Sequence, residues 1–420
     1  MSHHVLNSGV RVIADPMAGL RTLAISLVIR GGARWEDETC SGWSHLLEHM
    51  VFKGAGPRDA RALVEAIEAG GGSLNAYTGY EYTSYQARVL EGQLPLALEL
   101  LSDLVFAPTL DERELVREKG VIAQEIAEAF DTPDDHVFEM AQARAYEGQS
   151  LGRSILGTTA SIGTAGRDDL NTWRGTLYAP AHMVLSVSGA VDEDDLLALA
   201  EARFGHAPEG QPDPALVPAR FEGGVATDVR RIEQANLVFE LPAPGLGDPR
   251  WHALKVLSEI LGGGMASRLF QEVRERRGLA YAIDAFHQGY EDTGVLGIYA
   301  ATSGADAAQL GTVVADELKR LADDGPMADE VARARAQVRA QAFMAAESPA
   351  ARAERAGVQT LMMGAPESLD ALGMALDAVD APAVMALARD MLGQRRAAVA
   401  ALGPARAGAG AEAFMKALVA

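Results

Sequence analysis

A proline- and glycine-rich segment at residues 206–224, HAPEGQPDPALVPARFEGG, divides this 420-residue chain into two nearly equal halves. Its four prolines lack amide donors and disfavour helix in the residues before them, so we expect a linker. Each half then runs through a similar order of strand-like and helix-like stretches, which indicates a diverged duplication. We therefore predict a first domain at residues 1–207, a linker at 208–224 and a second domain at 225–420.

The order of these stretches predicts the fold class. In the first half, strand-like residues 10–14 and 22–32 precede helical stretches in the forties and at 58–69. In the second half, strand-like residues 235–242 precede a helical stretch at 251–263. Strands that follow one another without a regular strand–helix–strand alternation favour antiparallel or mixed sheets covered by helices, which is the α+β class.

Composition narrows the classes of partner and compartment. The chain has 37 Lys and Arg against 58 Asp and Glu, a formal net charge of −21. That charge repels phosphate backbones and attracts cationic peptides or metal ions, so we expect no nucleic-acid partner. Cys40 is the only cysteine, so no intramolecular disulfide can form, which fits a reducing cytoplasm. No N-terminal stretch has the length and apolarity of a membrane span, so we expect a soluble, cytoplasmic protein without a membrane partner.

The segment SGWSHLLEHMVFKG carries the most specific chemical pattern. His45 and His49 are four residues apart, which on a helix places both imidazoles on one face, where they can bind one Zn²⁺. Glu48 projects towards the same side and is the candidate general base for an attacking water. This order, H-x-x-E-H, is a metallopeptidase signature. Ser41 is a candidate cap for the helix.

A catalytic zinc site needs a third protein ligand. The helix-like segment DERELVREKGVIAQEIAEAF offers four carboxylates, on Glu114, Glu118, Glu125 and Glu128. Glu118 and Glu125 are two turns apart and share a helix face. Either of the two can bind the metal while the other orients a histidine, and the spacing does not choose between them.

These motifs resemble those of the pitrilysin-like zinc metallopeptidases, the family that includes insulin-degrading enzyme and the mitochondrial processing peptidase. The resemblance extends over nearly the whole chain, through HLLEHMVFKG, SLNAYTGYEYTSYQARV, REKGVIAQEIAE, YAPAHMVLSVSG and GGGMASRLFQEVRERRGLAYAI. The length is similar to that of the family's short, two-domain bacterial members. The resemblance implies two duplicated α+β halves of the processing-peptidase, LuxS-like type, arranged as a clamshell around a chamber.

The resemblance also assigns roles to particular residues. The family's spacing places the third zinc ligand 76 residues after His49, at Glu125, and leaves Glu118 as the acid that orients a histidine. In VRERRGLAY, Arg274 and Tyr281 match the family's remote pair, in which Arg holds a substrate carbonyl and Tyr donates to the oxyanion.

The segment SLNAYTGYEYT resembles the family's edge strand beside the zinc. An extended peptide can add to such an edge through main-chain hydrogen bonds, which makes Asn75 and Ala76 the candidate substrate-binding residues. The alternative is an ordinary hairpin with Asn75 in its turn.

We therefore expect a zinc metalloendopeptidase that cleaves oligopeptides or unfolded segments, as a homodimer or as a heterodimer with a related subunit. The alternative is a non-catalytic or half-active subunit of a heterodimeric peptidase of the same family. The presence of both the zinc motif and the Arg274/Tyr281 pair argues against that alternative. A metal-dependent hydrolase of a non-peptide substrate is a third hypothesis.

Overall fold

A computed structural model of the chain describes residues 1–207 and 216–419, so residues 208–215 of the predicted linker lie outside the described residues. The chain forms two compact units, each described here by itself. The first unit comprises Met1–Ala127, Ser154–Val217 and Met344–Glu367. The second unit comprises Glu128–Arg153, Pro218–Phe343 and Ser368–Ala420.

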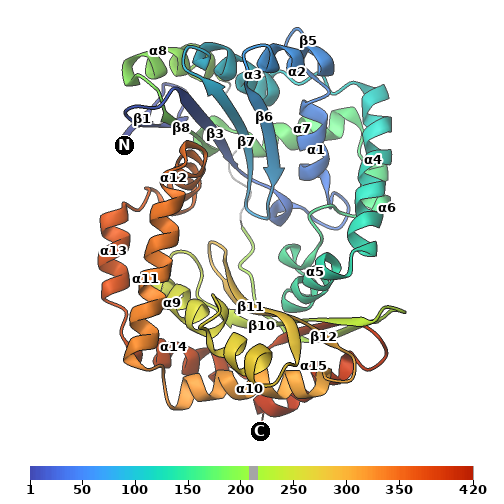
Figure 1. Cartoon of the computed structure of the whole chain (residues 1–420). Coiled ribbons are helices and arrows are strands. Elements are labelled where there is room, and N and C mark those ends of the chain that lie inside the picture. Colours follow the sequence, from blue (N-terminus) through green and yellow to red (C-terminus); the bar gives the residue numbers. More distant parts are fainter. Residues whose placement is uncertain (208–215, 420) are drawn as a thin grey trace. The chain divides into compact units, whose positions relative to one another are not determined.

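The first unit is built on a six-stranded sheet (Figure 1). In spatial order its strands are β1 (Ser2–Val5), β2 (Arg11–Pro16), β8 (Met183–Gly189), β3 (Thr22–Arg30), β7 (Tyr82–Leu90) and β6 (Ser73–Thr78). Only β2 and β8 pair in parallel, and the other neighbours are antiparallel. Side chains alternate between faces along a strand, so Ile25, Leu27 and Ile29 of β3 enter the main core of this unit.

Helices cover both faces of this sheet. The core face packs against helices of the N-terminal half, of which α1, α2, α3 and α8 contact strands of the sheet directly. The helices of that half in this unit are α1 (Trp43–Val51), α2 (Ala60–Glu68), α3 (Leu94–Phe106), α4 (Glu112–Asp131), α6 (Thr159–Thr164), α7 (Arg167–Leu177) and α8 (Glu193–Phe204). A small hairpin pairs β4 (Gly54–Ala55) with β5 (Arg58–Asp59). The opposite face is covered by α12 (Pro349–Met363), which packs on β3 and β8 (Figure 1).

The second unit has a five-stranded sheet of similar build. Its strands in spatial order are β11 (Ala280–Gly289), β12 (Gly294–Ser303), β10 (Gln234–Ala243), β13 (Ala398–Gly403) and β9 (Gly224–Val229). Its helices are α5 (Pro133–Ala145), α9 (Trp251–Gly262), α10 (Ala307–Asp323), α11 (Ala328–Ala345), α13 (Leu369–Asp377), α14 (Ala381–Gly393) and α15 (Gly408–Val419). Only β13 and β9 pair in parallel. Both units are thus mixed, mainly antiparallel sheets covered by helices, which confirms the predicted α+β class.

The division into compact units departs from the predicted boundaries at 207 and 225 in two places. Residues 128–153 belong to the second unit, because α5 buries Val137 and Ala141 against β10 and β13. Residues 344–367 belong to the first unit, because α12 packs on the sheet there.

No single helix among the described residues has the length and apolarity to cross a membrane. One bent pair of helices, Leu369–Asp377 with Ala381–Gly393, meets the length and composition criteria together across a bend of 84°.

Candidate metal centre

The helix α1 presents the histidine pair. Its first turn is fixed by Glu36, whose carboxylate accepts hydrogen bonds from the amides of Gly42 (2.6 Å) and Ser44 (2.7 Å). The predicted cap at Ser41 is therefore wrong, because the N-cap is Gly42 and an acidic side chain from outside the helix satisfies the free amides. Gly42 has φ 86°, and a Cβ there would lie 2.5 Å from the carbonyl oxygen of Leu156, so the entry into α1 requires glycine.

Three candidate ligand atoms converge on one point. Glu125 Oε2 lies 3.9 Å from Nε2 of His45 and 3.7 Å from Nε2 of His49. Within the described residues, His45, His49 and Glu125 form the one group of three His, Cys, Asp or Glu side chains close enough to hold a metal ion. Donors about 2.1 Å from a tetrahedral ion lie about 3.4 Å apart, so the observed separations fit zinc after a small contraction.

The environment of His45 favours its neutral form. Burial and, to a lesser degree, the nearby His49 lower the pKa of His45 to about 4. A neutral imidazole has a free lone pair, and binding a metal through that lone pair costs no deprotonation at neutral pH.

Glu118 orients the second histidine. One of its carboxylate oxygens lies 3.0 Å from Nδ1 of His49, and the other forms an ion pair with Lys53 Nζ at 2.8 Å. A bond from Nδ1–H to a carboxylate leaves the Nε2 lone pair directed at the metal position. Sequence reasoning missed Lys53, although its place four residues after His49 was a signal for it.

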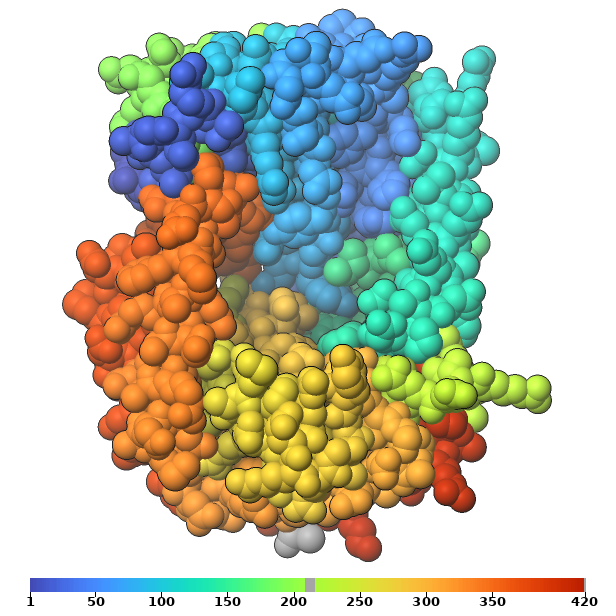
Figure 2. Space-filling view, viewed as in Figure 1, coloured from blue at the N-terminus to red at the C-terminus, as the bar shows by residue number. Residues whose placement is uncertain are grey.

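The two glutamates of α4 thus occupy different positions, although one helix carries both. The helix buries Leu115, Glu118 and Ile122, and its other residues are partly or fully exposed. Residues of this stretch, in turquoise, form part of the surface in Figure 2. The Glu118 side chain is 6% exposed and the Glu125 side chain 36% exposed. Only the carboxylate of Glu125 is near both Nε2 atoms.

Glu48 lies beside this group and is held by a residue of β6. Thr78 Oγ1 donates a 2.6 Å hydrogen bond to Glu48 Oε2. Burial raises the pKa of the Glu48 carboxyl, and the Thr78 bond acts in the opposite direction. A carboxyl with a raised pKa is better matched to accept and return a proton near neutral pH. Sequence reasoning missed the role of Thr78, because nothing in the spacing connects it with residue 48.

The segment predicted to be an edge strand forms β6, which is the last strand at one edge of the six-stranded sheet. Among the described residues, β6 pairs only with β7, with Asn75 opposite Gln86 and Ala76 opposite Tyr85. Asn75 is therefore in the strand and not in a hairpin turn. Ala76 packs against the main core and Asn75 is exposed on the opposite face. The side of β6 away from β7 pairs with no strand among the described residues, and strand addition needs such an unpaired edge.

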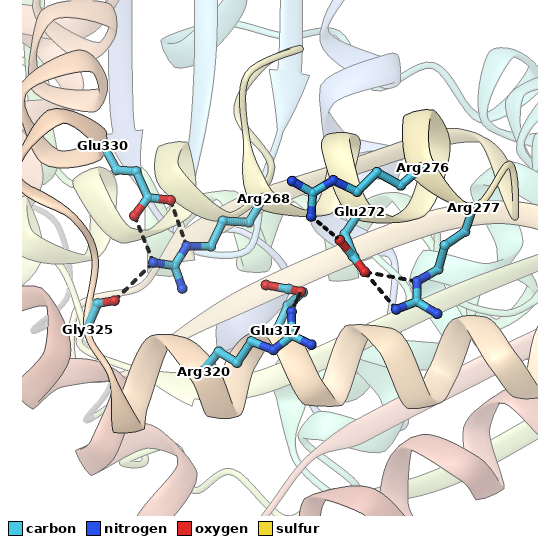
Figure 3. Close-up of polar contacts among 8 residues, drawn as sticks. All are labelled: Arg268, Glu272, Arg276, Arg277, Glu317, Arg320, Gly325 and Glu330. Carbon is cyan, nitrogen blue, oxygen red and sulfur yellow. Dashed lines mark hydrogen bonds and ion pairs between the residues drawn. The ribbon is translucent and has the colours of Figure 1, made fainter.

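Arg274 and Tyr281 lie together in the second unit. The Arg274 guanidinium carbon is 4.8 Å from the centre of the Tyr281 ring, and Tyr281 is 79% exposed. Arg274 belongs to a π-helical segment, Phe270–Arg276, in which Glu272 accepts from Arg276 and Arg277 (Figure 3). The metal group belongs to the first unit, so a role of this pair at the metal stays a prediction.

Two family profiles match long stretches of the chain. The profile described as insulinase, peptidase family M16, matches residues 11–159, which include the histidine pair and Glu125. The profile described as peptidase M16 inactive domain matches residues 164–338.

Bacterial relatives extend this match. YmxG of Bacillus subtilis, named an uncharacterized zinc protease, is 34% identical over 391 residues, which cover 93% of this chain and 95% of YmxG. An uncharacterized zinc protease of Rickettsia bellii is 35% identical over 379 residues, 89% of this chain and 92% of its own. The chain belongs to peptidase family M16.

Solved structures share the fold. A peptidase M16 inactive-domain structure from Pseudomonas fluorescens has a TM-score of 0.89 at 20% identity and covers 96% of this chain and 98% of its own. A protease from Helicobacter pylori has a TM-score of 0.88 at 19% identity and covers 96% of this chain and 99% of its own.

Proposed function

We propose that this protein is a zinc-dependent endopeptidase whose ligands are His45, His49 and Glu125. The observation that carries the proposal is the convergence of two imidazole Nε2 atoms and one carboxylate on a single point, with the Glu48 carboxyl beside it. The zinc proteases among its relatives support the choice of metal. A bound zinc ion would polarise the peptide carbonyl and acidify water.

The chain's own residues have separate tasks in this reaction. Glu48 accepts the proton of the attacking water and returns it to the amine that leaves. Thr78 holds the Glu48 carboxylate in one orientation, and Glu118 fixes the ring of His49. We assign Arg274 to the substrate carbonyl and Tyr281 to the oxyanion as part of the same proposal.

The substrate class follows from the edge strand. A peptide that adds to β6 through main-chain hydrogen bonds must be extended, so oligopeptides or unfolded segments are favoured over folded proteins. Asn75 and Ala76 would flank the bound peptide. A cationic peptide would be attracted by the net charge of −21. A homodimer, or a heterodimer with a related subunit, is the assembly we propose.

The test compares the wild type with Glu48→Gln, both loaded with zinc, on a mixed peptide library. The variant should keep one zinc per chain and lose cleavage by about 10²-fold or more, because the amide cannot take the proton. Cleavage retained by the variant would refute the role of Glu48. A zinc-loaded wild type that cleaves nothing alone but cleaves with a related subunit would favour the alternative of a half-active subunit.

A further inference from the structure

The sheet of the first unit has an unusually polar second face. Side chains that point away from the main core include four hydroxyls and one carboxylate, all buried, from Asp15, Ser26, Ser84, Ser186 and Ser188. The helix α12 covers this face. Buried polar groups need hydrogen-bond partners, so contacts between specific atoms, and not apolar area alone, fix the helix on the sheet.

One carboxylate of α12 joins three strands. Glu354 Oε2 accepts from Ser26 Oγ of β3, from Ser84 Oγ of β7 at 2.8 Å and from Gln86 Nε2 of β7 at 3.0 Å. Its other oxygen accepts from the Tyr77 hydroxyl of β6 at 2.5 Å. Glu354 therefore connects the helix to the free edge of the sheet, where the peptide substrate is proposed to bind.

The edge strand presents its two faces to two different carboxylates. Tyr77 points towards α12 and donates to Glu354, whereas the next residue, Thr78, points to the opposite face and donates to Glu48. Because β6 pairs only with β7 among the described residues, its other restraints come from such side-chain bonds and from the packing of Leu74 and Ala76 on the core. A displacement of the strand at Tyr77 would move Thr78, and with it the carboxylate of Glu48.

We infer that Glu354 is a positioning residue of the active site. Through Tyr77 it holds β6 in the position from which Thr78 orients Glu48. This inference rests on the proposed function, since it assigns Glu354 to the reaction that Glu48 serves. Glu354 contacts the edge strand through the Tyr77 hydroxyl and is not a member of the metal group. It lies about 300 residues from Glu48 in the sequence, in the half of the chain without the zinc motif.

The structure supplies a matched control on the same helix. Arg352 forms a two-pronged ion pair with Asp15 of β2, at 2.5 and 2.7 Å. In the sheet order, β2 and β6 are separated by β8, β3 and β7. Loss of the Arg352 pair weakens the attachment of α12 without touching β6, so it separates a general structural role of the helix from positioning of the edge strand.

The experiment uses the full chain loaded with zinc and compares Glu354→Gln, Tyr77→Phe and Arg352→Ala. Glu354→Gln replaces one carboxylate oxygen by an NH2 group, which cannot accept the hydrogen bonds that the strands donate to Glu354. Tyr77→Phe removes only the hydroxyl and keeps the ring, so we expect this variant to fold. The measurements are amide hydrogen exchange of residues 73–78, zinc content, melting temperature, and kcat and KM on a fluorogenic peptide from the library.

We expect Glu354→Gln and Tyr77→Phe to speed exchange in residues 73–78 and to lower kcat/KM by about tenfold at unchanged zinc content. Arg352→Ala should lower the melting temperature and leave the exchange rates of residues 73–78 and kcat/KM within about twofold of the wild type. Unchanged exchange in Tyr77→Phe and Glu354→Gln, or an equal loss of kcat/KM in Arg352→Ala, would overturn the inference. A wild type that cleaves no peptide would instead defeat the proposed function, and the exchange comparison would then decide alone whether Glu354 holds β6.

Discussion

At the scale of single residues, the site depends on how one helix makes two glutamates chemically different. The Glu118 carboxylate is enclosed between Lys53 and Nδ1 of His49, so both of its oxygens are already engaged. The Glu125 carboxylate is more exposed and faces the Nε2 atoms of both histidines. One glutamate therefore fits the role of metal ligand, and the other fits the role of its support.

This difference predicts an order of metal affinities. Glu125→Ala removes one of three ligands and should abolish stoichiometric zinc binding, whereas Glu118→Ala should weaken it by about 10- to 100-fold. Zinc content after dialysis against graded chelator measures both. An equal or greater loss in Glu118→Ala would reverse the assignment of the ligand.

Glu240 on β10 supplies a pH-dependent prediction away from the site. Its carboxyl is buried, Oε2 has no hydrogen-bond partner in the described part of the chain, and burial raises its pKa to about 8 from an ordinary value of 4.5. Between these two values the unfolded chain releases the proton and the folded chain keeps it. The folded state then binds more protons, so stability falls as pH rises through that window.

Glu240→Gln should remove this decline. Near pH 5 the variant and the wild type should have similar free energies of unfolding, and near pH 9 the variant should be more stable by at least about 1.4 kcal/mol, the equivalent of one pKa unit. Urea unfolding at both pH values checks this, with the exposed Glu412→Gln as control. Parallel pH profiles for wild type and Glu240→Gln would show that the carboxyl is not held neutral.

At the scale of elements, α12 lies unusually close to its sheet at Gly357. A Cβ there would lie 2.8 Å from Val28 Cγ2, which is closer than real Cβ contacts. Val28 belongs to the central strand β3, so it has little freedom to move. The absence of a side chain at this position is what allows the contact.

Gly357→Ala should therefore destabilise the protein by about 1–3 kcal/mol in spite of the higher helix propensity of alanine. Gly175 of α7 is a matched control, because nothing lies within 4 Å of its Cβ position. Gly175→Ala should gain about 0.5–1 kcal/mol. Chemical denaturation measures both changes, and a stabilising Gly357→Ala would contradict the close packing.

Elements with strong local patterns could be predicted from the sequence, and long-range polar contacts could not. The predicted strand at residues 22–32 and the helix at 251–263 correspond to β3 and α9, because their apolar residues have the spacing of the core that they enter. The position of α12 on the first unit could not be predicted, because the hydrogen bonds and apolar contacts that fix it join residues far apart in the sequence. Thr78 could not be predicted either, because no spacing connects it with Glu48, whereas the histidine pair has the spacing of one helix face.

At the scale of the whole molecule, each half of the sequence gives one helix to the compact unit of the other half. The helix α5 covers a face of the second sheet, and α12 covers a face of the first. A chain cut between the halves would leave each fragment with one sheet face uncovered. Each uncovered face would expose apolar residues and leave polar groups without their partners on the missing helix, which disfavours independent folding.

Two fragments, residues 1–207 and 216–420, should therefore be poorly folded when expressed separately and should associate when expressed together. Co-purification through a tag on one fragment, followed by circular dichroism of each species, checks this. Fragments that each fold cooperatively as monomers would show that α5 and α12 are dispensable.

X-ray absorption at the zinc edge of the loaded wild-type protein tests whether His45, His49 and Glu125 hold the metal. We predict one zinc per chain, with two imidazole nitrogens and a carboxylate oxygen at about 2.0–2.2 Å, and loss of this signal in Glu125→Ala. A zinc bound by the Cys40 sulfur at about 2.3 Å, or a spectrum unchanged in Glu125→Ala, would contradict that assignment.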